Sequence, residues 1–436
     1  MKPFVAILIC GLPVWAQYAG PAVLSRGDIP SAMEAPQLSF RPFVEVNAIY
    51  DTGLTGVGLT SEGQLPNISS GGVQVAGGVS GAHSWRHTQI GVDYYGDVRE
   101  YPNASFYDGT DQSLMLGIKH QFTRHIYLNL RESAGEFNYG GGVQTLSEAV
   151  PFDPAQSYVP ATDFFDNRVF FGTTQADLII QRSARLSFDL GGDGFINRQR
   201  SAALIGVDGA AARGDVQYRL SRYTTIGANY TYTHFSFNHI YSSTDINGAA
   251  GTYAVQFNRT TEFTGYGGFM RLESKFIQDV PVDPTVAAII GITESPEVIY
   301  SVRYIPNISA RLSRTFEHGV AYITGGHTVT PGNGLFLTSS MTQISVGYTY
   351  TGLRRWSFHS FLSYQKMESI GNVIGEYGGW QGTASLSRQV TRSVHFIAAF
   401  NARDYNSKDF PLYNHTFYDA RVGIGFAPGD VPLRVW

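Results

Sequence analysis

The chain has 436 residues, 15% of them charged and 14% aromatic, with 49 glycines and one cysteine. A soluble core stops growing at about 250–300 residues, so the chain forms either several soluble domains or one large closed sheet. The formal net charge of -4 is too small to indicate a nucleic acid or an acidic substrate as a partner.

The N-terminus has the features of a secretory signal peptide. Lys2 gives it a positive start, residues 4–12 form a short apolar stretch, and Val14 and Ala16 are small residues before a cleavage point. We therefore predict a signal peptide over residues 1–16. Cleavage there would leave no cysteine in the mature chain, which would exclude disulfides and cysteine ligands.

Residues 17–38 are rich in Pro, Ala, Gly and Ser and show no period, so we predict a flexible periplasmic segment. From Phe40 onward, apolar and polar residues alternate in segment after segment, which is typical of strands with one apolar and one polar face. The longest strongly apolar run, residues 286–292, is far shorter than the roughly 20 residues of a helical membrane span. Residues 39–436 are thus predicted to form one all-β domain.

The connections between these strands alternate strictly between short and long. The short ones are expected at 83–87, 123–125, 182–185, 221–223, 258–261, 314–318, 351–356 and 391–393. The long ones are expected near 54–71, 102–110, 139–166, 198–203, 240–251, 275–299, 332–335, 370–376 and 407–414. Eight short and nine long connections predict eighteen strands, with sixteen as the alternative. A sandwich with Greek-key connections does not require short and long connections to alternate.

With these features the chain resembles a bacterial outer-membrane β-barrel of porin-like size, without a named family. The resemblance covers roughly Phe40 to the C-terminus and implies a single closed antiparallel transmembrane β-barrel with short periplasmic turns and long outer loops. The chain ends in an aromatic residue, Trp436, as such proteins often do, although the last alternating segment is 418–426.

The alternation in residues 225–235, TIGANYTYTHF, assigns side chains to faces. In a barrel its apolar set should face lipid: Ile226, Ala228, Tyr230 and Tyr232. The intervening Thr225, Asn229, Thr231 and Thr233 should then face the lumen. Tyr232 is expected in an outer aromatic girdle, and Tyr348, Tyr350 and Trp356 in a periplasmic one, because aromatic rings collect at membrane interfaces.

The same alternation predicts a pore wall with charges of both signs. The predicted pore-lining residues are Asp93, Asp97, Arg99, Lys119, Arg131, Asp177, Asp189, Asp215 and Arg403, and Arg421 is a further candidate. The third long loop, 139–166, is expected either to fold inward as a constriction or to be an ordinary exposed loop. As a constriction it would supply Glu148, Asp153, Asp163 and Asp166. In the sixth loop, Asp283 should cap a short helix beginning at Pro284, and that loop is expected to cover the pore mouth.

Motifs for catalysis or metal binding are not evident. The eleven histidines are scattered, and His234, His239 and Asp245 near the outer rim are the nearest approach to a catalytic set. The glycine-rich GGDGF at 191–195 is not followed by a helical pattern and is interpreted as a bend in a strand. We expect neither an enzyme nor a bound cofactor or metal.

The leading prediction is a porin-like channel in the outer membrane of a Gram-negative-type bacterium, passing small hydrophilic solutes by passive diffusion. Its partners would be the lipid bilayer and those solutes, without nucleic acid, and a homo-oligomer is left open. A closed structural or adhesive outer-membrane barrel is one alternative. An exported soluble all-β binding protein is the other.

Overall fold

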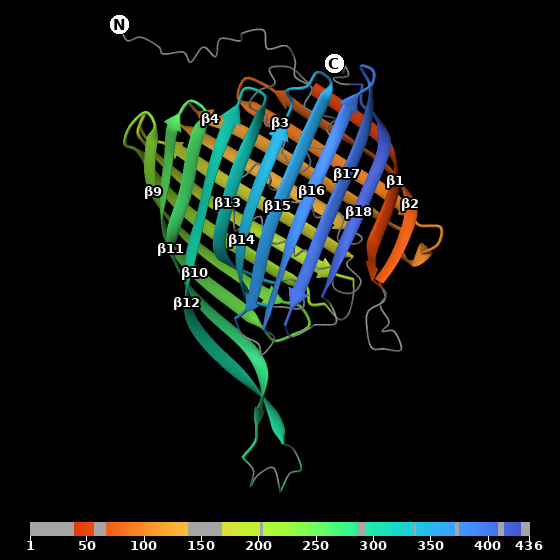
Figure 1. The fold of residues 1–436 in the computed structure, drawn as a ribbon. Helices are drawn as coiled ribbons and strands as arrows, with labels where there is room; N and C mark the ends of the chain where they lie inside the picture. The colour runs from red at the N-terminus through yellow and green to blue at the C-terminus, as the bar shows by residue number, and fades with distance from the viewer. Residues whose placement is uncertain are drawn as a thin grey trace.

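The chain forms one antiparallel sheet that closes on itself. The computed structural model describes residues 39–55, 67–137, 168–200, 204–283, 293–332, 337–370, 375–408 and 414–428, with residues 285, 289, 291 and 334. The sheet has eighteen strands, and it closes because β1 pairs with β18 as well as with β2 (Figure 1). No helix in these ranges is long and apolar enough to cross a membrane.

The strands follow one another along the chain and pair with their sequence neighbours. Their bounds are β1 Ser39–Thr55, β2 Asn67–Ser84, β3 Thr88–Glu100, β4 Gly109–Thr123, β5 Ile126–Phe137, β6 Val169–Gln181, β7 Leu186–Gln199, β8 Val207–Arg219, β9 Thr224–Phe237, β10 Ser243–Asn258, β11 Thr261–Pro281, β12 Glu294–Phe316, β13 Gly319–Thr330, β14 Ser339–Tyr350, β15 Trp356–Ser369, β16 Glu376–Gln389, β17 Val394–Ser407 and β18 His415–Phe426. A short 3-10 helix, η2 Ser105–Tyr107, lies between β3 and β4.

The predicted number of eighteen strands is confirmed, and the alternative of sixteen is wrong. All eight predicted short connections join the expected strands at one end of the barrel, here called the turn rim, and the opposite strand ends form the loop rim. The closing ladder pairs Val44 of β1 with Phe426 of β18, so the first and last strands meet near the turn rim.

The outer face of the barrel carries a belt of exposed apolar side chains. In β9, Ile226 and Tyr230 are 38% and 54% exposed, and the ladders place Ile226 beside Tyr218 of β8 and Tyr253 of β10, which are also exposed. The same face carries Val46, Leu116, Leu190, Ile344, Leu362 and Val422 on other strands. Apolar side chains on the outside of a closed barrel are what a transmembrane barrel requires, and an exported soluble protein is excluded.

The boundaries at the loop rim differ from those predicted. Residues 240–251 were predicted to be a loop, but β10 begins at Ser243. Residues 275–299 were also predicted to be a loop, but β11 and β12 leave only 282–293 between them. The β11–β12 hairpin continues away from the rim (Figure 1), so the expectation that this loop covers the pore mouth is wrong. Asp283 Oδ1 accepts the backbone N–H of Thr285 at 2.8 Å, as the predicted cap requires, while the helix predicted from Pro284 lies mostly outside the described residues.

β12 separates from β13 on the way into this hairpin. The β12–β13 ladder begins at Ile308 paired with His327 and runs toward the turn rim. Pro306 lies two residues beyond Ile308, and proline has no N–H to continue a ladder. From Glu294 to Asn307, β12 therefore pairs with β11 and with no other strand among the described residues.

Candidate functional site

The candidate site is the inner wall, the face of the sheet opposite the apolar belt. The ladders place all nine predicted pore-lining residues on this face, in rows such as Lys119 beside Asn129 and Asp189 beside Asp215. Asp97 and Arg403 are buried there, with 3% and 9% of their surface exposed. The other seven and Arg421 are half-buried.

A cluster of one arginine and four aspartates occupies the inner wall of β6–β8. We call it the Arg213 cluster: Asp177, Asp189, Asp193, Arg213 and Asp215. Arg213 binds the carboxylate of Asp177 and lies 3.8 Å from Asp193 Oδ1, while Asp189 and Asp215 lie opposite each other on adjacent strands. One guanidinium among four carboxylates gives this part of the wall an excess of negative charge.

Sequence reasoning missed two members of the Arg213 cluster. Asp193 lies in the glycine-rich segment that was interpreted only as a bend, and Arg213 was not considered. Both share the odd-numbered face with Asp189 and Asp215, so the alternation applied through β7 and β8 would have found them.

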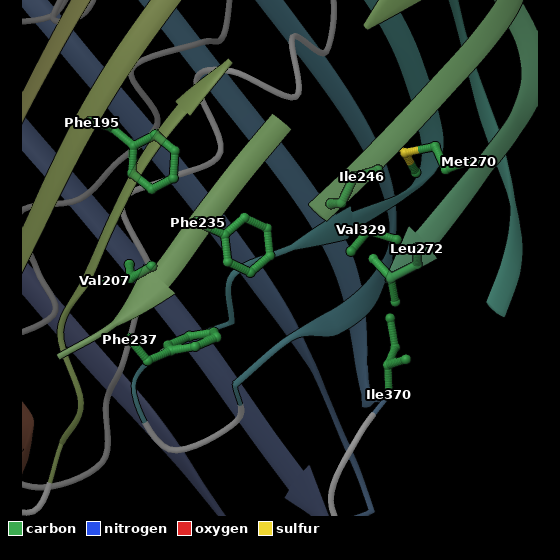
Figure 2. Packing of buried hydrophobic residues seen from close by; sticks show 9 residues of the cluster. All are labelled: Phe195, Val207, Phe235, Phe237, Ile246, Met270, Leu272, Val329 and Ile370. Atoms are coloured by element: carbon green, nitrogen blue, oxygen red, sulfur yellow. The ribbon is translucent and has the colours of Figure 1, made fainter. Parts of the chain in front are cut away.

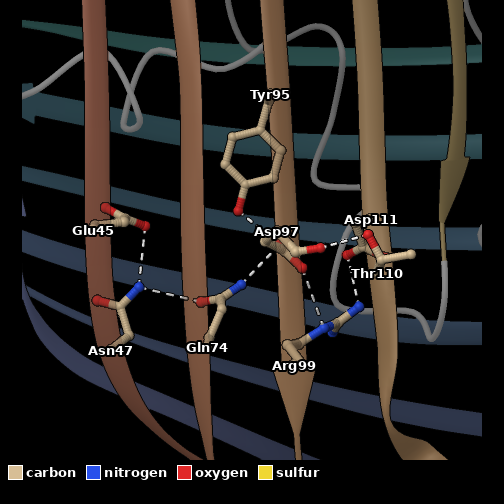
Figure 3. A network of polar contacts seen from close by, with 8 residues as sticks. All are labelled: Glu45, Asn47, Gln74, Tyr95, Asp97, Arg99, Thr110 and Asp111. Atoms are coloured by element: carbon tan, nitrogen blue, oxygen red, sulfur yellow. Dashed lines mark hydrogen bonds and ion pairs between the residues drawn. The ribbon is translucent and has the colours of Figure 1, made fainter.

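A second network links the inner walls of β1–β4 (Figure 3). The Gln74 amide donates to Asp97 Oδ2 at 2.8 Å, and the Tyr95 hydroxyl donates to the same oxygen at 2.7 Å. Arg99 donates to Asp111 Oδ2 at 2.7 Å, and its Nε lies 3.6 Å from Asp97 Oδ1. Because the Gln74–Asp97 and Arg99–Asp111 hydrogen bonds cross from strand to strand, they fix the charges at defined positions on the wall.

The network continues to β1 through two amides. Asn47 Nδ2 donates to Glu45 Oε1 at 3.1 Å and to Gln74 Oε1 at 3.2 Å. Glu45 and Asn47 are almost fully buried. Sequence reasoning identified Asp97 and Arg99 but not Glu45 or Asp111, although all four alternate onto the same face.

The opposite sector of the inner wall is uncharged. Along β13–β16 the strand residues on this face include no Asp, Glu, Lys or Arg, because Lys366, Glu368, Glu376 and Arg388 alternate onto the outer face. Pairs of serine hydroxyls lie along the sector. The Oγ atoms of Ser345 and Ser363 are 2.9 Å apart, and those of Ser357 and Ser387 are 2.6 Å apart. A charged sector on β1–β8 therefore faces an uncharged sector across the barrel.

Near the loop rim the inner wall becomes apolar. A buried set of side chains, here called the rim cluster, comes from β7–β11, β13 and the residue after β15 (Figure 2). Its members are Phe195, Val207, Phe235, Phe237, Ile246, Met270, Leu272, Val329 and Ile370. The inward positions therefore change from polar to apolar along the strand. On β9, the inward residue is Thr225 near the turn rim and Phe235 near the loop rim.

Described residues of the β13–β14 connection form hydrogen bonds beside this apolar wall. The Gly334 carbonyl accepts the backbone N–H of Ile205 at 3.0 Å, and the Thr338 hydroxyl lies 2.6 Å from that of Thr244 in β10. The Thr338 carbonyl accepts the N–H of Ile370 at 2.9 Å. Gly334 has φ +89°, and a Cβ there would meet the Ile205 carbonyl oxygen at 3.1 Å. Only glycine fits this approach without strain.

His234 and Asp245, the nearest approach to a catalytic set, lie together on the outer face. His234 Nδ1 is 2.8 Å from Asp245 Oδ1, and the Tyr232 hydroxyl donates to the same oxygen at 2.7 Å. The Tyr230 hydroxyl donates to Asn247 at 2.8 Å, and His239 lies in the β9–β10 connection. Tyrosines with polar partners at this height form the predicted outer aromatic girdle.

Aromatic residues also gather at the turn rim, as predicted. Tyr348 and Tyr350 stack with ring centroids 6.3 Å apart, and the Arg388 guanidinium lies 5.1 Å from the Trp356 ring.

Several predicted residues lie outside the described part of the chain. They are the signal peptide, the segment 17–38, the third-loop acids Glu148, Asp153, Asp163 and Asp166, and Trp436. Within the described part, no group of three or more His, Cys, Asp or Glu side chains is arranged to hold a metal ion.

No protein-family model matches the sequence, and no curated protein matches it. Solved structures are similar to it only distantly. A BenF-like porin from Pseudomonas fluorescens Pf-5 is 9% identical, with a TM-score of 0.43 over 90% of this chain and 98% of that chain. Acinetobacter baumannii OccAB3 is 11% identical, with a TM-score of 0.41 over 89% and 98%. Pseudomonas aeruginosa OccK2 in complex with glucuronate is 10% identical, with a TM-score of 0.41 over 90% and 98%.

Proposed function

We propose that this chain is an outer-membrane channel that passes small hydrophilic solutes by passive diffusion. The observation that carries the proposal is the division of the closed barrel into an apolar outer belt and an inner wall with charges of both signs. Barrels of 16–18 strands are too wide for wall side chains alone to fill. Water and solutes are the natural occupants of such an interior.

The place and direction of the barrel follow from the same features. We place it in the outer membrane of a Gram-negative-type bacterium, exported by a signal peptide at residues 1–16. The turn rim would face the periplasm and the loop rim the outside, as in barrels with short periplasmic turns. The channel role leaves no reaction to assign, so the protein is proposed as a transporter without enzymatic activity.

The wall suggests how solutes would be selected. Eight of the nine pore-lining residues and the Arg213 cluster put fixed charges on β3–β8, and Arg403 adds one on β17, while β13–β16 offer hydroxyls and amides. Such a wall exerts a transverse field across the lumen and sorts solutes by charge and dipole. Because aspartates outnumber arginine in the Arg213 cluster, the channel should prefer cations.

The third loop is proposed to narrow this path. If Glu148, Asp153, Asp163 and Asp166 line a constriction, converting them together to amides should lower the preference for cations. Deleting residues 145–162 should raise conductance, whereas an unchanged conductance would place the loop outside the channel.

A closed structural barrel is the second candidate. It is favoured by the burial of Glu45, Asp97 and Arg403 on the inner wall and by the hydrogen bonds of the β13–β14 connection beside the rim cluster. In that case the charges would stabilise the wall by pairing with one another.

Conductance in a planar lipid bilayer separates the two candidates. The purified barrel should give discrete current steps after insertion, with a reversal potential in a salt gradient that indicates cation preference. Repeated insertions verified by protein detection, without any current, would exclude the channel and leave the structural barrel.

A further inference from the structure

The β11–β12 hairpin carries a strand edge that no described residue covers. Beyond Ile308, the edge of β12 on the side away from β11 has no partner strand among the described residues over 294–307, and the hairpin projects past the loop rim (Figure 1). The unpaired stretch of β12 is longer than that of β11, whose ladder with β10 ends at Lys275 and leaves residues 276–281 paired with β12 alone. Exposed edges offer unpaired N–H and C=O groups to another strand.

The sequence of this edge favours strand pairing. Residues 297–305, EVIYSVRYI, are mostly β-branched or aromatic, the residue types most common in strands. Val298, Tyr300, Val302 and Tyr304 are between 42% and 72% exposed. Pro296 and Pro306 flank the segment, so the length that can pair is limited at both ends.

Residues 294–303 of this edge lie farther along the hairpin than the outer aromatic girdle. The outer girdle includes Tyr230 and Tyr232, and the ladders place Tyr232 in one row with Asn247, Arg271 and Tyr304. Glu297 and Lys275 lie farther along the hairpin than that row, where water can solvate their charges. The edge is therefore available to a partner in the aqueous phase.

The charges on the edge are self-complementary. An antiparallel pairing of two copies about Tyr300 puts Tyr300 opposite the partner's Tyr300 and Val298 opposite the partner's Val302. It also puts Glu297 opposite the partner's Arg303, twice by symmetry. Moving the centre to Ile299 would place Arg303 opposite the partner's Ser295, and moving it to Ser301 would place Glu297 opposite the partner's Ile305. Only the register about Tyr300 pairs opposite charges among these three.

We propose that the β12 edge binds the same edge of a second copy of this chain, antiparallel and centred on Tyr300. Cross-strand pairs of opposite charge stabilise such a register, and like charges oppose it. Because each hairpin continues away from its own barrel (Figure 1), antiparallel pairing places the two barrels at opposite ends of the joined hairpins. The copies that pair therefore lie in membranes that face each other.

The register is tested by cysteine cross-linking of the full chain in detergent. Cys10 is the only native cysteine, so the variants are made with Cys10→Ser. Tyr300→Cys should form a disulfide-linked dimer under mild oxidation, because directly opposed residues lie within disulfide range. Tyr304→Cys is the matched control, since Tyr304 is more exposed but would face the partner's Pro296. Equal dimer yields at the two positions would overturn the register.

Charge exchange tests the pairing without cross-linking. Glu297→Arg and Arg303→Glu should each lower the dimer fraction in sedimentation, and the double exchange should restore it. The gel shift of unboiled samples confirms that each variant folds, and Glu317→Arg at the turn rim serves as a control that should leave the dimer unchanged. A double variant no better than the singles would refute the proposal.

Vesicle aggregation tests the arrangement in facing membranes. Two dye-labelled vesicle populations should aggregate with the native chain and not with Glu297→Arg. Dimers in detergent without vesicle aggregation would refute the facing-membrane arrangement.

Discussion

The hydroxyl oxygens of Thr338 and Thr244 lie 2.6 Å apart although 94 positions separate them in the chain. Both are buried, and Thr244 is also 3.2 Å from the Ser274 hydroxyl. This contact joins the β13–β14 connection to β10 and β11, where β12 no longer lies beside β13. Hydrogen bonds of Gly334 and Thr338 thus tie this connection to Ile205 and to β10 near the place where the β12–β13 ladder stops.

Thr244→Val should loosen this connection. The substitution keeps the shape of the side chain but removes the hydroxyl partner, and losing one buried hydrogen bond costs about 1 kcal/mol. If the barrel conducts, we expect more frequent current fluctuations in single-channel recordings, with an unchanged gel shift. Thr252→Val, on the same inner face of β10 nearer the turn rim, is the control, and equal fluctuations in both variants would argue against a role for the connection.

Arg213→Gln should increase the preference for cations. The change removes the guanidinium among Asp177, Asp189, Asp193 and Asp215 and leaves four carboxylates on one part of the wall. The reversal potential in a potassium chloride gradient should move toward that of potassium. Asp177→Asn should move it in the opposite direction, and a shift of the same sign in both variants would show that the cluster does not set selectivity.

The two faces of β9 should differ sharply in their tolerance of charge. Ala228 lies on the outer face and Asn229 on the inner face, in adjacent positions. Ala228→Arg places a charge in hydrocarbon and should destabilise the barrel by about 2–4 kcal/mol near the bilayer midplane. Asn229→Arg places the same charge on the polar wall and should be tolerated. Urea titration of the barrel in lipid measures the free energy of unfolding of both variants. If Asn229→Arg were the more destabilising variant, the two faces of this strand would be assigned the wrong way round.

An epitope tag should be accessible on intact cells at the loop rim but not at the turn rim. The β9–β10 connection, with Ile240, and the β6–β7 turn, with Ser183, are on opposite ends of the barrel. We expect antibody binding with a tag after Ile240 and none with a tag after Ser183. Binding at Ser183 alone would show that the barrel sits in the membrane the other way up.

The sequence predicted the strand number because the alternation and the connection lengths are both consequences of a barrel in a bilayer. In β9 the outward set, Ile226, Ala228 and Tyr230, is apolar because lipid surrounds it. The eight short turns were found because each is a brief interruption between two segments of clear alternation.

The errors arose where the bilayer no longer dictates the pattern. On β10 near the loop rim, the outward residues are Asp245 and Asn247, while Ile246 and Ala250 face inward and are buried. A strand in water that packs its apolar side on a core has this pattern. It is the reverse of the lipid-facing pattern on which the prediction relied, so the stretch was interpreted as a loop. The Arg213–Asp193 contact was also beyond prediction, because it depends on the register between β7 and β8.

The ladder between β1 and β18 has one further consequence. It joins Val44–Asp51 to Asp419–Phe426 by the same antiparallel pairing as any other neighbouring strands. No strand is therefore first or last in the folded wall, and the chain could be opened at another turn. A circular permutant that begins at Ser183 and links the present barrel ends by a short peptide should assemble the same cylinder, since the order of strands around it would not change.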